Sequence, residues 1–113
     1  PGEYSEPQGC LLVVEVDDMP MGAVGLRPLE RGVAEIKRLY VRPGTRGIVL
    51  GRLSVAEIVA RGRSICYRTL SLDTVCGLMV GAERLYHDVG FVEIPPYYDN
   101  FIEGAVYYEL SIT

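Results

Sequence analysis

The sequence has no apolar run near the ~18 residues that a membrane-spanning helix needs, and no membrane partner is expected. Its N-terminus, PGEYSEPQG, is polar and unlike a secretory signal peptide. Three irregularly spaced cysteines (Cys10, Cys66 and Cys76) and one histidine (His87) match no zinc pattern, so they favour reduced, mostly buried thiols and predict no metal site. A single histidine without a nucleophile elbow also argues against a serine or cysteine hydrolase.

Excess positive charge is also missing. The net charge of −4 argues against a nucleic-acid partner, because proteins that bind nucleic acid usually carry a strongly basic face. Hydrophobic residues make up 49% and charged residues 23%, as in ordinary soluble globular proteins. We expect a single domain over residues 1–113, located in the cytoplasm.

The most informative segment is VRPGTRGIVLGR, residues 41–52, between an apolar strand and an apolar helix. Glycines at such a junction let backbone N–H groups approach an anion, and the helix N-terminus adds about half a positive charge. Arg46 and Arg52 can hold the rest of a phosphate. Taken alone, the segment fits an ordinary turn equally well.

The predicted order of elements is three strands, a helix, a strand, a helix and two strands. The predicted strands are Cys10–Val16, Met21–Leu26, Val33–Val41, Leu70–Thr74, Phe91–Ile94 and Ala105–Ile112, and the predicted helices are Val49–Arg63 and Met79–Val89. Pro28–Gly32 is predicted as a connection, and Gly90 as the stop of the second helix. The first helix is expected to bury a stripe of Leu50, Leu53, Ala56, Val59 and Ala60. This order indicates a mixed α/β or α+β sheet.

Five segments, in order, resemble the GNAT superfamily of acyl-CoA-dependent N-acetyltransferases. They are EIKRLYVRPGTRGIVLGR at 35–52, LDT at 72–74, RLYHDVGF at 84–91, IPPYYDN at 94–100 and GAVYYEL at 104–110. The resemblance implies a mixed, mainly antiparallel central sheet with flanking helices and a splayed strand pair. The family's first strand and the one or two helices after it have no counterpart before Cys10, so the chain is either a fragment or completes the fold in another way. Loss of the first strand would expose a sheet edge and favour a homodimer.

The resemblance implies acetyl-CoA as co-substrate. The positions that it assigns to the cofactor are Leu39, Val41, Arg46, Gly47, Val49, Gly51 and Arg52. Pantetheine would bond to the backbone at Leu39 and Val41, although the side chains of both also suit plain core packing. At Val49 the family has a glycine; a β-branched residue resists positive φ and crowds an approaching phosphate, so weakened cofactor binding is expected.

The resemblance places Tyr86 near the thioester sulfur as the acid that protonates the leaving thiolate, whereas the residues alone favour a buried aromatic. Glu35 is the candidate base for the acceptor amine, directly or through water. It fits equally well as a charge in solvent or paired with Lys37 or Arg38.

Tyr97, Tyr98 and Asp99 follow two prolines and suit a small-molecule or peptide amine through cation–π and charge contacts. The alternative is a loop whose tyrosines cover the core. The expected function is acetyl transfer to an amine by direct attack in a ternary complex. The alternative is a non-catalytic module of the same fold that binds acyl-CoA or is purely structural.

Overall fold

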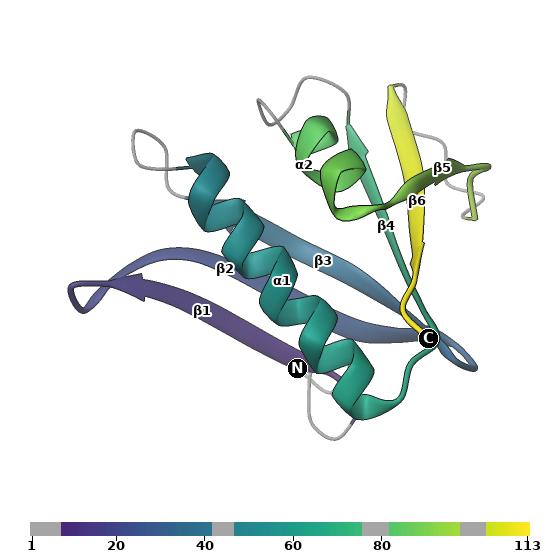
Figure 1. The fold of residues 1–113 in the computed structure, drawn as a ribbon, viewed down its shortest axis with the longest axis horizontal. Helices are drawn as coiled ribbons and strands as arrows, with labels where there is room; N and C mark the ends of the chain where they lie inside the picture. Colours follow the sequence, from purple (N-terminus) through teal and green to yellow (C-terminus); the bar gives the residue numbers. More distant parts are fainter. Residues whose placement is uncertain (1–7, 42–46, 76–81, 98–103) are drawn as a thin grey trace.

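A computed structural model describes residues 8–41, 47–75, 82–97 and 104–113. The described strands form one six-stranded sheet in the order β1-β2-β3-β4-β6-β5 (Figure 1). The strands are β1 (Cys10–Val16), β2 (Met19–Glu30), β3 (Val33–Val41), β4 (Thr69–Val75), β5 (Val92–Ile94) and β6 (Ala105–Ser111). Among the strands that the structure describes, only β3 and β4 pair in parallel, and the other neighbouring strands are antiparallel. The predicted mixed, mainly antiparallel fold is therefore confirmed.

The two described helices are α1 (Gly47–Ile65) and α2 (Ala82–Val89). In Figure 1, α1 crosses in front of β1, β2 and β3, whereas α2 lies in front of β4. Of the predicted second helix, positions 79–81 lie outside the described residues. Neither described helix is both long and apolar enough to cross a membrane.

Strand β2 is longer than the sequence predicts, because the predicted connection at Pro28–Gly32 begins inside it. Pro28 pairs with Ala34 of β3, and the register shifts between Pro28 and Glu30. A proline has no N–H to donate to the sheet, and it is tolerated at such an irregularity. The longer strand brings Arg27 opposite Glu35, which the predicted strand end at Leu26 did not allow.

The buried face of α1 differs from the predicted stripe. Leu53, Ala56 and Ala60 are exposed. The residues that α1 buries instead are Leu50, Gly51, Ser54, Val55, Ile58, Val59 and Gly62. On this face, small residues such as Gly51 and Ser54 are buried in place of some of the apolar residues that the spacing predicted. The hydroxyl of the buried Ser54 donates to the carbonyl of Leu50 at 2.8 Å, so burial leaves this hydroxyl with a hydrogen-bond partner.

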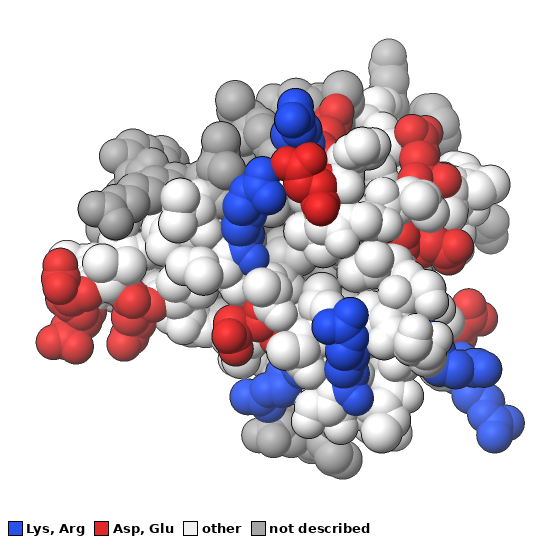
Figure 2. Space-filling model, in the orientation of Figure 1, with Lys and Arg blue, Asp and Glu red and all other residues white. Residues whose placement is uncertain are grey.

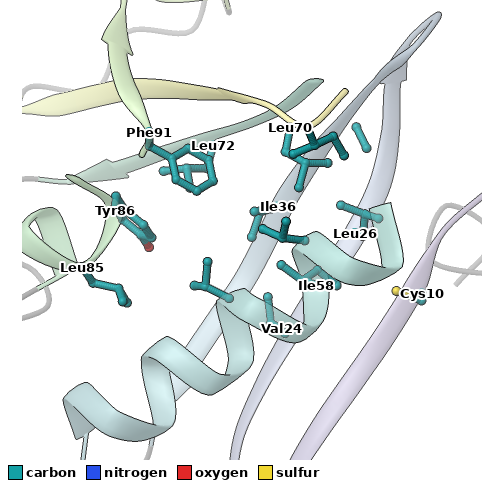
Figure 3. Close-up of a cluster of buried hydrophobic side chains, with 14 residues drawn as sticks. Cys10, Val24, Leu26, Ile36, Ile58, Leu70, Leu72, Leu85, Tyr86 and Phe91 are labelled. Carbon is teal, nitrogen blue, oxygen red and sulfur yellow. The ribbon is translucent and has the colours of Figure 1, made fainter. Parts of the chain in front are cut away.

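The core lies between this face of α1 and the sheet. Figure 3 shows Ile58 of α1 close to Val24, Leu26 and Ile36 of the sheet. Figure 3 also shows Leu85 and Tyr86 reaching the same cluster from α2. One continuous core thus joins both helices to the sheet.

Strand β1 lies at one end of the sheet and presents two unlike faces. Cys10 is buried in the core, whereas Leu11 and Val13 are 51% and 57% exposed. Alternate residues of a strand point to opposite faces, so these two side chains lie on the face opposite Cys10. The expectation of buried thiols holds for Cys10 but not for Cys66, which is exposed. Cys76 lies outside the described residues.

The C-terminus of α1 has a left-handed cap formed by a residue with a side chain. Cys66 has a φ of +78°. Its N–H donates to the carbonyl of Arg63 and that of Tyr67 donates to Gly62, both at 3.0 Å, which is the hydrogen-bond pattern of a Schellman cap. Gly90 ends α2 as predicted, with a φ of +114°.

We predict that Cys66→Gly raises the free energy of unfolding by about 0.5–1 kcal/mol, because glycine adopts the left-handed conformation without steric strain. Urea denaturation of the reduced protein measures the change. The matched control, Gly90→Ala at the corresponding cap of α2, should destabilise the protein. An unchanged or lower midpoint for Cys66→Gly would show that Cys66 carries no strain.

Candidate functional site

Strands β3 and β4 pair over a short stretch and then separate. The parallel pairs are Val33 with Thr69, Ala34 with Leu70 and Glu35 with Ser71. Within the described strands the pairing ends there, although β3 continues to residue 41 and β4 to residue 75. Figure 1 shows the two strands diverging from this end, as the resemblance implied. Backbone groups that leave a ladder need another partner, such as water or a ligand.

Strand β3 also contains a bulge beyond the point of separation. Gly25 of β2 pairs with Lys37 and Ala23 pairs with Tyr40, so two residues of β3 stand opposite one of β2. The extra residue lies at positions 38–39, and a bulge of this kind changes the direction of the backbone groups at that point. Leu39, a predicted cofactor contact, is thus part of the bulge.

Glu35 carries a carboxylate with no exposed surface. Arg27 donates to Oε1 of Glu35 from Nε at 2.8 Å and approaches it with Nη2 at 2.7 Å. The hydroxyl of Tyr97 donates to Oε2 at 2.8 Å. A buried carboxylate needs such partners to remain charged. The structure thus brings together a predicted catalytic residue and a predicted substrate contact that lie 62 positions apart.

Lys37 bridges the two strands where their pairing ends. Its Nζ lies 3.0 Å from Oδ1 of Asp73 on β4 and 3.7 Å from Oε2 of Glu35. Lys37 and Asp73 are each two residues beyond the last backbone pair, Glu35 and Ser71, and therefore share a face of the sheet with that pair. Beyond the last backbone pair, the ion pair between Lys37 and Asp73 therefore connects β3 with β4.

Tyr86 approaches from α2 and is buried. Its ring centroid lies 5.8 Å from those of Phe91 and Tyr108, and Figure 3 shows the side chain pointing from α2 into the buried cluster. Burial, followed by the effects of Tyr108 and Asp73, raises the pKa of Tyr86 to about 12. The phenol therefore stays protonated at neutral pH and can act as a hydrogen-bond donor.

The N-terminal part of α1 contains four of the residues that were assigned to the cofactor, namely Gly47, Val49, Gly51 and Arg52. Val49 lies within α1 and is 52% exposed. It is not among the described residues with positive φ, so it does not adopt the left-handed conformation that a β-branched residue resists. Gly51 is buried, and a Cβ at this position would lie 3.2 Å from Cδ2 of Leu85. This glycine allows the close approach of α1 and α2, which is a packing role.

Arg52 is engaged with α2. Its Nη2 donates to Oδ2 of Asp88 at 2.6 Å, and Nε of Arg84 donates to Oδ1 at 3.1 Å. The hydrogen bond from Arg52 is the main cause that lowers the pKa of Asp88. Figure 2 shows basic and acidic side chains next to one another over the region where the two helices meet. A phosphate at this position would compete with Asp88 for Arg52.

A separate cleft of about 600 Å³ lies between α2 and β5, lined by residues that include His87, Phe91 and Glu93. Neither Glu35 nor Tyr86 is part of its lining. Among the described residues, no group of three or more histidine, cysteine and acidic side chains is placed to hold a metal ion.

Some of the predicted site residues lie in the described strands and helices, and others do not. Arg46, Tyr98 and Asp99 lie outside the described residues, and Gly47 begins α1. The backbones of Leu39 and Val41 lie in β3 beyond the separation from β4, where the resemblance put the pantetheine contacts.

Sequence reasoning missed Arg27 and Asp73 as parts of the site. Arg27 and Glu35 lie four residues before and four residues after Arg31 in the turn at residues 31–32, so a longer hairpin would have paired them. Asp73 belongs to the quoted LDT segment, but nothing local distinguishes it from an ordinary strand charge.

We predict that Tyr86 makes stability depend on pH at alkaline values. Because folding raises its pKa above the reference value of 10, the stabilisation is complete below pH 10 and is lost as the pH rises toward about 12. Over this range the wild type should lose roughly 2–3 kcal/mol more than Tyr86→Phe in urea denaturation. Tyr40→Phe, at an exposed tyrosine, should follow the wild type. If the free energies of unfolding of Tyr86→Phe and wild type changed equally with pH, Tyr86 would not be the source of the pH dependence.

Known proteins resemble this chain in sequence and fold. Residues 2–91 match the profile described as "Acetyltransferase (GNAT) family". An uncharacterized N-acetyltransferase of Schizosaccharomyces pombe is 39% identical over 113 residues, which cover 98% of this chain and 69% of that protein.

Solved structures agree in fold. A GNAT-family acetyltransferase from Staphylococcus aureus has a TM-score of 0.83 at 18% identity, covering 99% of this chain and 73% of its own. A GNAT-family acetyltransferase from Elizabethkingia anophelis, solved with acetyl-CoA bound, has a TM-score of 0.76 at 17% identity, covering 92% of this chain and 76% of its own. The chain belongs to the GNAT acetyltransferase family.

Proposed function

We propose that the protein is an acetyl-CoA-dependent N-acetyltransferase that moves the acetyl group to an amine by direct attack in a ternary complex. The observation that carries the proposal is the separation of β3 from β4 beyond Glu35 and Ser71, with Lys37, Asp73 and Tyr86 gathered around it. Membership of the GNAT family and the N-acetyltransferase relative support the same activity.

The separated strands suit an extended ligand that contains amide groups. Pantetheine has two amides, and the backbone of β3 at Leu39 and Val41 can bond to them as an added strand would. The bulge at positions 38–39 turns backbone groups at this point, where a thioester carbonyl would be polarised. Gly47 would bring backbone N–H groups at the start of α1 to the pyrophosphate.

Tyr86 serves this chemistry best as a hydrogen-bond donor to the leaving sulfur. A thiol with a pKa near 8.5 is a stronger acid than a phenol whose pKa is about 12, so complete proton transfer from Tyr86 would be uphill. A hydrogen bond to the developing thiolate stabilises it without that transfer. The proton that the amine loses then neutralises the sulfur.

The charge of Glu35 attracts the positively charged acceptor, and its carboxylate is the base that accepts the proton of the amine, directly or through water. Its Oε2 accepts from Tyr97 and lies 3.7 Å from Nζ of Lys37, whereas Arg27 bonds to Oε1, so Oε2 is the oxygen beside the proposed acceptor contact at Tyr97. The ring of Tyr97 packs edge-on against Tyr107, with centroids 5.0 Å apart, which fixes the direction of the hydroxyl. The acceptor is proposed to be a small-molecule or peptide amine that contacts this tyrosine.

The rival function is a non-catalytic member of the fold. Two observations favour it: Val49 projects from the first turns of α1, and Arg52 is already bonded to Asp88. Such a protein would bind acetyl-CoA weakly or not at all, and would release no CoA in the presence of amines.

A thiol-release assay with acetyl-CoA and a panel of primary amines tests the proposal. The wild type should release CoA with at least one amine, and Tyr86→Phe should lower kcat roughly 10- to 100-fold with little change in KM for acetyl-CoA, since the lost hydrogen bond forms only as the sulfur gains charge. Tyr40→Phe is the control. Binding of acetyl-CoA without release by any amine would support the non-catalytic rival.

We predict that Val49→Gly tightens acetyl-CoA binding measured by calorimetry, because it removes the branched side chain from the approach to the start of α1. Leu53→Gly is the matched control, since Leu53 is as exposed as Val49 and lies about one turn further along the same helix. Both changes place a glycine in α1 and cost similar helix stability. Equal affinities for wild type and Val49→Gly would refute the steric argument.

A further inference from the structure

Lys37 is the single lysine in the sequence; arginine supplies the other ten of the eleven basic residues. A primary amine on a side chain therefore occurs at one position only, and that position lies on β3 just beyond its last pair with β4. A guanidinium stays protonated at all relevant pH values and does not serve as an acyl acceptor, whereas a lysine amine does so once it is neutral.

Two carboxylates hold the lysine amine at the separation of the strands. Nζ lies 3.0 Å from Oδ1 of Asp73 and 3.7 Å from Oε2 of Glu35. The side chain of Lys37 is 30% exposed, so it is reachable from solvent although it is anchored. The charge of Asp73 also contributes to raising the pKa of Tyr86, so one carboxylate acts electrostatically on both the lysine and the tyrosine.

The same place is where an external acceptor would arrive. With a thioester carbonyl polarised near Leu39, the approaching amine would pass the carboxylate of Glu35, and Lys37 lies between these two residues on β3. The amine of Lys37 thus stands where the proposed reaction needs an amine.

We propose that Lys37 is an internal acetyl acceptor of this protein and is acetylated on Nζ by acetyl-CoA bound between β3 and β4; the inference rests on the proposed function. The ammonium first loses a proton to water beside Asp73. The lone pair of Nζ then attacks the thioester carbonyl carbon, a C–N bond forms, and the C–S bond breaks with its electrons going to sulfur. The second proton leaves nitrogen and protonates the thiolate, giving an amide, free CoA and one released proton.

Acetylation changes the electrostatics of the site. The amide carries no charge, so Asp73 loses the ammonium 3.0 Å away and the bridge between β3 and β4 is broken. The acetylated protein therefore presents a more negative site to an external amine than the unmodified protein does.

The test incubates the whole chain with acetyl-CoA and no added amine, followed by mass spectrometry. The expected result is a gain of one acetyl group, located by tryptic digestion in an uncleaved peptide spanning residues 32–38. Labelling should be about tenfold or more faster in the folded protein than in urea, because the fold positions the amine. The first-order rate should not change on dilution, as expected for reaction within one chain.

Lys37→Arg keeps a positive charge for Asp73, and the intact variant should show no gain of an acetyl group. Equal labelling of folded and unfolded protein would overturn the proposal, since it would indicate uncatalysed acetylation. An unmodified Lys37 in a preparation that releases CoA with an added amine would also overturn it, while the proposed function stands. An unmodified Lys37 together with no release for any amine would overturn both.

Discussion

The carboxylate of Glu35 is fully buried, and a buried charge is tolerated only where donors and opposite charges surround it. Arg27 reaches it from β2, Lys37 from its own strand and Tyr97 from the segment after β5. These partners come from three parts of the chain, so a single ionic cluster ties the β2–β3 hairpin to the C-terminal half. The extension of β2 to residue 30 and the position of Tyr97 each provide this carboxylate with a partner.

The helices depend on a second constraint, which is close approach. Gly51 lets α1 approach Leu85 of α2, and Gly62 lets the other end of α1 approach Leu70 and Ile112. In both places a Cβ would come within about 3.2 Å of a core methyl group, which is tight for a packed interior. Beyond residues 35 and 71, β3 and β4 have separated, and α1 and α2 remain joined across that region through Leu85 and the Arg52–Asp88 pair.

Local patterns in the sequence predicted the element order and the stop at Gly90, because each rests on neighbouring residues. The splayed strand pair came from the family resemblance, since it joins strands that are far apart in the sequence. Arg27 was missed because Pro28 looked like the end of a strand, although pairing with β3 carries the strand through the proline. The stripe through Leu53, Ala56 and Ala60 was wrong because apolar spacing cannot show that small residues such as Gly51 and Ser54 are the ones buried. The bond between Arg52 and Asp88 joins residues 36 positions apart, which no local pattern reveals.

The two edge strands of the described sheet, β1 and β5, differ in how well a further strand could pair with them. At one end, β5 has three residues and runs into two prolines, which have no N–H to donate. At the other end, β1 has seven residues, with Leu11 and Val13 exposed on one face. A long edge with apolar side chains is the better template for strand addition. Among the described strands, β1 is therefore favoured over β5 as the place where a further strand adds to the sheet.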